Sequence, residues 1–152
     1  MCNGEYADMI VASFGRWKPI NLEYGGMIST SNAELFEDID DVFSTTNFYP
    51  CYDDLIIRLK KVRQRISLML AFAEEVKKDI EKNFPDLKIL HNDMRGLNVV
   101  IRFSNDEEKN QIEKYCESRL FEYVRCPKYI RVDEDAISIE LKRLDIEGRQ
   151  KR

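Results

Sequence analysis

Histidine and cysteine, from which most metal sites and nucleophilic triads are built, are scarce in this sequence. His91 is the single histidine, and the four cysteines, Cys2, Cys51, Cys116 and Cys126, include no pair at the Cys-x-x-Cys spacing. A structural zinc site needs such clustered ligands, so the sequence predicts no metal site. Four cysteines are also too few for a disulfide scaffold, which favours a reducing, cytoplasmic location. Histidine-dependent catalysis would have to use His91, which we expect in a loop.

An excess of positive charge is also absent, and so are long apolar runs. The 24 lysines and arginines stand against 28 aspartates and glutamates, for a formal net charge of -4 at pH 7. This sign is wrong for a protein whose main partner is a phosphate backbone. No stretch approaches the roughly 20 apolar residues that cross a bilayer, and the first residues lack the pattern of a signal peptide. We therefore expect a folded cytoplasmic protein without nucleic-acid or membrane partners.

A long segment between Asp53 and Phe84 contains neither proline nor glycine. Its apolar residues recur at alternating spacings of four and three, which predicts a single helix of about eight turns with one apolar stripe. Such a stripe is typical either of a coiled-coil seam or of a helix that links two packed layers. Apolar residues on the other faces (Ile57, Leu68, Leu70 and Phe72) favour the linking helix. The stripe consists of Leu55, Leu59, Val62, Ile66, Met69, Ala73, Val76 and Ile80.

Two charged segments of opposite sign stand out. The long helix carries the basic residues Arg58, Lys60, Lys61, Arg63 and Arg65. We expect a solvated face there, with contact to a carboxylate or to nucleic acid as the less favoured alternative. Residues 33–43 are acidic and are predicted to form a helix capped by Ser31 or Asn32.

The remaining elements are short. We expect strands over residues 7–14, as a buried strand, and 27–30 before the long helix. After Pro85 ends that helix, strands are predicted over 88–90, 97–103, 129–132 and 136–141. A Ser104-x-x-Glu107 capping box predicts a further helix that runs to Leu120. The order of elements indicates an α+β protein whose C-terminal domain has the order β-β-α-β-β.

The loop after the first strand carries the chemistry that the sequence offers. Ser13 ends the strand, Arg16 and Lys18 follow, and Gly25-Gly26 allows a close backbone turn. A lysine beside another cation in a partly desolvated loop is a setting in which an amine serves as a Schiff-base nucleophile. Taken alone, a lysine in such a loop is more often a solvated surface residue.

The spacing in this loop resembles the lysine region of the DegT/StrS family of fold-type I aminotransferases. The match consists of Ser13-Phe14-x-x-x-Lys18, then Gly25-Gly26, then a strand that ends in Thr30-x-Asn32-x-Glu34-Leu35. The resemblance implies that pyridoxal 5'-phosphate is the cofactor, that Lys18 forms the internal aldimine and that Ser13 contacts the cofactor phosphate. The sequence departs from the family where Glu23-Tyr24 precede the two glycines.

By the same resemblance the chain looks like the C-terminal half of such an enzyme. Residues 1–51 would be a remnant of the large domain of a pyridoxal-phosphate transferase, with its incomplete set of short strands. Residues 52–84 would be the long linking helix and residues 85–146 the small C-terminal domain. Residues 147–152 would form a polar tail.

Two functions follow as hypotheses. The first is a truncated transferase that moves an amino group from an amino acid to a keto-sugar or other keto acceptor through a Lys18 Schiff base. It would work as a homo-oligomer, such as a dimer, or with a partner chain that supplies the N-terminal half, and could be inactive alone. The second is a non-catalytic oligomerisation or interaction module derived from an aminotransferase.

Overall fold

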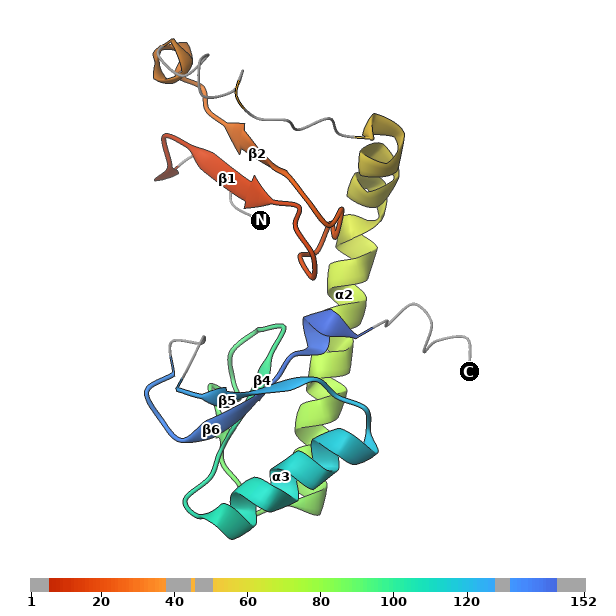
Figure 1. The fold of residues 1–152 in the computed structure, drawn as a ribbon, viewed down its shortest axis with the longest axis vertical. Coiled ribbons are helices and arrows are strands. Elements are labelled where there is room, and N and C mark those ends of the chain that lie inside the picture. Colours follow the sequence, from red (N-terminus) through yellow and green to blue (C-terminus); the bar gives the residue numbers. More distant parts are fainter. Residues whose placement is uncertain (1–5, 38–44, 46–50, 128–131, 145–152) are drawn as a thin grey trace. The chain divides into compact units, whose positions relative to one another are not determined.

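The computed structural model describes residues 6–37, 45, 51–127 and 132–144. They form two compact units, Met1–Arg63 and Gln64–Arg152, and the boundary between the units falls within the long helix. Two antiparallel sheets and this helix make the protein an α+β protein, as predicted (Figure 1). The division into residues 1–51, 52–84, 85–146 and 147–152 stays a prediction.

The long helix, α2, runs from Tyr52 to Asn83. Asp53 and Asp54 lie in its first turn and Lys82 in its last, where each charge is favourable to the helix dipole. The Phe84 amide still donates to the Ile80 carbonyl, and Pro85 then ends the helix. The helix is the one that the alternating spacing predicts.

The second unit contains a four-stranded antiparallel sheet in the order β3-β4-β6-β5. The strands are β3 (Ile89–Leu90), β4 (Val99–Arg102), β5 (Tyr123–Cys126) and β6 (Ala136–Ile139). The order β-β-α-β-β is therefore confirmed, with β5, which the sequence did not predict, as its third strand. Of the strand predicted over residues 129–132, residues 129–131 lie outside the described residues.

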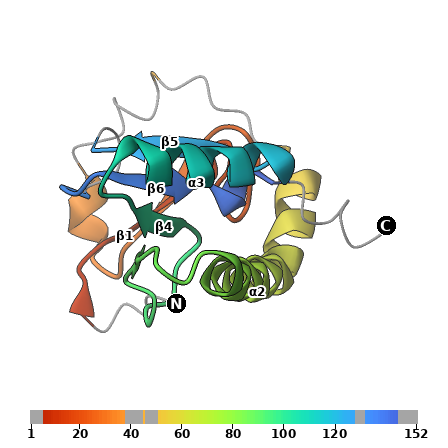
Figure 2. The same ribbon diagram turned by 90° about the horizontal axis from the view of Figure 1, so that it is seen from below.

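The core of this unit lies between one face of the sheet and two helices. In β4 and β6, Val99 pairs with Ile139 and Ile101 pairs with Ile137, so all four side chains point to the same face. The C-terminal half of α2 and helix α3 (Asp106–Ser118) cover this face with the rest of the core cluster (Figure 2). The helical contribution consists of Met69, Ala73, Val76, Ile80, Ile112, Tyr115 and Cys116.

Helix α3 begins one residue later than the sequence predicts. The cap is Asn105 rather than Ser104, since the Asn105 side chain accepts from the Glu108 amide at 2.9 Å. The Glu108 carboxylate in turn accepts from the Ser104 amide at 2.7 Å. Asn105 therefore takes the place assigned to Ser104, and the Glu108 carboxylate binds the amide of the residue before the cap rather than that of the cap itself.

The same helix ends in a Schellman motif. The Leu120 amide donates to the Glu117 carbonyl, and the Phe121 amide donates to the Cys116 carbonyl. Leu120 adopts the left-handed conformation that this motif requires, with φ of 56°, although glycine is the usual residue there.

The first unit is built on a two-stranded antiparallel sheet of β1 (Ile10–Ser13) and β2 (Gly26–Ser29). Gly26 is required at the Ser13 pair, because a Cβ there would lie 2.5 Å from the Ala12 carbonyl oxygen. The expectation of a buried strand over residues 7–14 was wrong, since β1 alternates between half-buried and exposed residues. A two-stranded sheet has no second layer of its own to cover both faces.

A short 3-10 helix, η2 (Ala33–Phe36), follows β2, and its Asn32 cap accepts from the Glu34 amide at 3.0 Å. Within the described residues the predicted helix over 33–43 is reduced to this single turn. Residues 38–43 lie outside the described residues.

We expect Leu120→Gly to stabilise the protein. Leu120 is 80% exposed, so its side chain contributes little packing, while its left-handed backbone is strained. Glycine removes the strain and should raise the unfolding free energy by about 1 kcal/mol, measured by urea unfolding. Leu120→Ala removes the same exposed atoms but keeps the Cβ, so an equal gain in both variants would contradict the backbone explanation.

The buried Cys116 thiol makes stability depend on alkaline pH. Burial, with Glu113 and Glu117 nearby, raises its pKa from 9.0 to about 12. Above pH 9 the unfolded chain loses a proton that the folded chain keeps, so the unfolding free energy falls as pH rises. From pH 8 to pH 10.5 this group alone should cost about 2 kcal/mol.

Urea titrations of the protein and of Cys116→Ala at both pH values measure this loss. Burial and the Asp79 hydrogen bond raise the pKa of Tyr115 as well, so the variant should keep part of the pH dependence. An identical decline in both proteins would exclude Cys116 as a cause.

Candidate functional site

Lys18, the predicted Schiff-base residue, lies in a turn after β1. Its amide donates to the Gly15 carbonyl at 3.1 Å, and its side chain is exposed. Ser13 is also exposed, and its hydroxyl accepts from the Gly15 amide at 3.3 Å. The serine hydroxyl thus takes part in the turn of its own loop.

The rest of this loop is held by local contacts. Asn21 accepts from the Trp17 amide at 2.8 Å, and the Arg16 guanidinium lies 4.9 Å from the centre of the Trp17 ring. Arg58 of α2 donates to the Asn21 carbonyl and pairs with Asp54, which ties the loop to the first turns of the helix. Among the described residues no cluster of histidine, cysteine, aspartate or glutamate could hold a metal ion.

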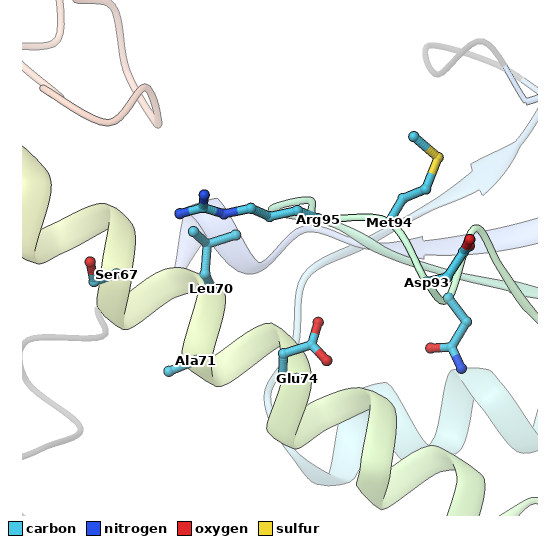
Figure 3. Close-up of a pocket in the computed structure, with 8 residues that line it drawn as sticks. Ser67, Leu70, Ala71, Glu74, Asp93, Met94 and Arg95 are labelled. Atoms are coloured by element: carbon cyan, nitrogen blue, oxygen red, sulfur yellow. The ribbon is translucent and has the colours of Figure 1, made fainter. Parts of the chain in front are cut away.

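A shallow pocket of about 550 Å³ lies in the second unit, between α2 and residues 92–95 (Figure 3). The buried Lys77 ammonium binds this turn to the helix, with bonds to the Glu74 carboxylate and to the carbonyls of Asn92 and Met94. All three ammonium protons therefore have acceptors. Lys77 therefore holds the turn of residues 92–95 against α2, and this structural role explains its burial better than a role as a nucleophile does.

A buried carboxylate, Glu140, lies just after β6 and is 2% exposed. One of its oxygens accepts from Asn98 at 3.0 Å and from Ser138 at 3.1 Å, and the other lies 2.8 Å from the Lys142 ammonium. Arg143 approaches the same oxygen at 3.8 Å. Because the chain's own donors surround the carboxylate, this cluster joins β4, β6 and the following turn rather than presenting an acid to solvent.

Exposed apolar side chains gather in the first unit. Thirteen large apolar residues are exposed in the described part of the chain, and eleven of them lie between residues 6 and 59. The buried apolar residues among those described show the opposite distribution, since two of them, Phe14 and Leu22, lie in this unit and eighteen lie in the second. The exposed set in the first unit consists of Tyr6, Met9, Val11, Tyr24, Met27, Ile28, Leu35, Tyr52, Ile56, Ile57 and Leu59.

Part of this surface is formed by the hairpin. Val11 and Ile28 are direct partners across the two strands and point to the same face, where they are 70% and 41% exposed. The described residues add no third strand to this sheet. The apolar pair of Val11 and Ile28 is exposed on this sheet.

The other part is the N-terminal half of α2. Tyr52, Ile56 and Leu59, at positions i, i+4 and i+7, lie on one side of the helix and are 68%, 47% and 42% exposed. We call these three residues the open stripe. Further along the helix, Ala73 and Ile80, at the heptad position of Tyr52 and Leu59, are buried in the core.

These features define a class of protein: an α+β chain with one well-packed domain and one unit whose apolar residues lie largely at the surface. A family model described as the MJ1341 family C-terminal domain matches residues 63–151. It covers more than half of the 152 residues, so the chain belongs to the MJ1341 family. No curated protein and no solved structure matches the chain.

The resemblance to the DegT/StrS family was therefore wrong. The family model identifies another family, and nothing found in the comparisons supports a truncated fold-type I aminotransferase or a pyridoxal-phosphate enzyme. The residues matched by the motif form a loop of glycine, proline and short polar side chains, which local turn chemistry alone can select. The roles of Lys18 and Ser13 at a cofactor stay predictions, now without the resemblance that suggested them.

Sequence reasoning missed both Glu140 and the open stripe. In the alternating pattern of β6, Ile137 and Ile139 are on the apolar side, and Glu140 falls on the opposite, polar side. Nothing in the neighbouring sequence therefore indicated that Glu140 would be buried. The apolar Ile56, outside the predicted stripe and next to it on the helix, was the available sign of a wider apolar face.

Among the described residues, no helix combines the length and apolar composition needed to cross a membrane.

We expect Glu140→Leu to lower the unfolding free energy by about 3 kcal/mol. The change leaves Asn98 and Ser138 without their acceptor and separates two cations from their carboxylate. Ser138→Ala, which removes a single donor, should cost about 1 kcal/mol. Urea unfolding measures both losses, and an unchanged midpoint for Glu140→Leu would refute the structural role of this cluster.

Proposed function

We propose that this protein is a non-catalytic association module that forms homo-oligomers through the exposed apolar residues of its first unit. The observation that carries the proposal is the concentration of exposed apolar side chains between residues 6 and 59. A concentration of exposed apolar side chains favours an interaction site, because burying them in an interface removes them from water.

The contrast between the two units supports this proposal. The second unit buries its apolar residues between a sheet and two helices, as an independent domain does. The first unit buries Phe14 and Leu22 among its described residues and pairs two strands, which is marginal for stability in water. Association would supply the apolar contacts that the first unit does not make by itself.

The buried polar groups support a non-catalytic role. Lys77 and Glu140, the buried charged residues among those described, are each surrounded by partners from the chain itself.

We propose a cytoplasmic setting, since the three described cysteines are free thiols.

The purified full chain should therefore self-associate. Light scattering coupled to size-exclusion chromatography should give a mass above that of the 18.0 kDa monomer as concentration rises. Ile56→Gln with Leu59→Gln keeps good helix formers but removes apolar contacts, and should weaken association at least about tenfold. Val11→Thr with Ile28→Thr tests the hairpin in the same way while keeping β-branched residues.

Leu120→Gly is the control, because it removes an even more exposed apolar side chain from the second unit. It should leave the mass unchanged. A wild-type chain that stays monomeric at every concentration, or apolar variants that associate as the wild type does, would refute the proposed function.

A further inference from the structure

Two segments of the chain carry opposite charges in equal number. Residues 58–65 contain five basic residues and no acidic one, and residues 34–41 contain five acidic residues and no basic one. Both segments also carry apolar side chains, which is the composition of surfaces that dock through apolar contacts and select partners by charge.

We propose that the open stripe of α2 is the docking site for the acidic segment around η2 of a second copy of this chain. The inference rests on the proposed self-association and names the surfaces that make the contact. Each copy would offer one basic helix and one acidic segment, so a two-fold dimer would contain the contact twice.

The helix side of the contact is defined by spacing along α2. Lys60 follows Ile56 by four residues and Lys61 follows Ile57 by four, so each exposed lysine lies directly beyond an exposed isoleucine on the helix surface. A partner that covers the apolar side chains therefore meets the two ammonium groups at its edge. This arrangement favours an occupant with apolar and acidic residues close together.

A second α2 is a poor occupant for this site. In the heptad that begins at Tyr52, the positions flanking the seam in this half of the helix include Arg58, Arg63 and Arg65. Two such helices side by side, parallel or antiparallel, would bring arginines against arginines. Like charges at these positions oppose pairing, so the basic flanks select against a homotypic coiled coil and in favour of an acidic segment.

The acidic side of the contact is described at η2. Glu34 and Glu37 are exposed, and Leu35 between them is 41% exposed. Within one chain, η2 and the first turns of α2 lie apart in both views (η2 in orange, the helix start in yellow; Figures 1 and 2). The occupant that this geometry favours is therefore the segment of another copy rather than that of the same chain.

A charge-reversal exchange tests the pairing. One variant carries Lys60→Glu and Lys61→Glu, and the other carries Glu34→Lys and Glu37→Lys. In each variant alone, positions 60 and 61 of one surface and positions 34 and 37 of the other carry charges of the same sign, so self-association should weaken at least about tenfold. In a mixture both contacts regain opposite charges, and a one-to-one heterodimer should form, detected by native mass spectrometry with one variant isotope-labelled.

Lys78→Glu with Lys114→Glu is the control, since it reverses two exposed charges in the second unit and should associate as the wild type does. Circular dichroism should show that all variants keep their helix content. Monomeric single variants that form the heterodimer on mixing would establish the contact between copies.

The remaining outcomes overturn the inference in distinguishable ways. If the charge variants associate as the wild type does while the apolar variants do not, the proposed function stands and the charge pairing fails. A second outcome is that each variant is monomeric and the mixture forms no heterodimer, but a chain with all four changes associates as the wild type does. The acidic segment would then dock on the helix of its own chain rather than on that of another copy. A monomeric wild type overturns both proposals.

Discussion

The packing of α2 against the C-terminal sheet is the interaction on which the rest of this structure depends. Met69, Ala73, Val76 and Ile80 enter the core from one side of the helix and meet the apolar face of β4 and β6. Burying a large apolar side chain contributes about 1.5–3 kcal/mol, so this one row supplies a large part of the stability of a small domain.

The same row of heptad positions continues toward the N-terminus of the helix, and there its surroundings change. Leu55, Val62 and Ile66 are half-buried, and Tyr52 and Leu59 are exposed. The apolar row of α2 is thus longer than the part of it that is buried in the core of the second unit. A feature that stabilises one unit by burial becomes, a few turns away, the surface through which association can gain free energy.

Much of the fold was predictable from residue spacing. The alternation of three and four predicts α2, and the alternation of apolar and polar residues predicts β4 and β6, because each period follows from the geometry of a regular element. Strand β5 was missed since Tyr123–Cys126 is short and has no clear alternation. The cap of α3 shifted by one residue because Ser104 and Asn105 are both good caps and tertiary packing chooses between them.

The proposed association surface was less predictable from the sequence than the fold. An apolar stripe shows which side of a helix avoids water, but not whether the covering layer comes from the same chain. The lysine motif led to a wrong prediction of family. A few residues in a Gly-rich loop matched a family to which the chain as a whole does not belong. Local patterns report local geometry, and a cofactor site depends on groups distant in sequence.

The charges decide what the apolar surface can accept. Apolar contact is non-directional, so the open stripe alone would bind any complementary apolar face, including its own copy. The arginines beside the seam make that self-pairing unfavourable, and the lysines next to the exposed isoleucines favour a carboxylate-bearing partner. The chain carries such a segment from η2 onward, since residues 34–41 contain five acidic residues against the five basic residues of positions 58–65. In the proposed dimer, specificity would therefore come from the placement of charge around an apolar stripe rather than from the stripe itself.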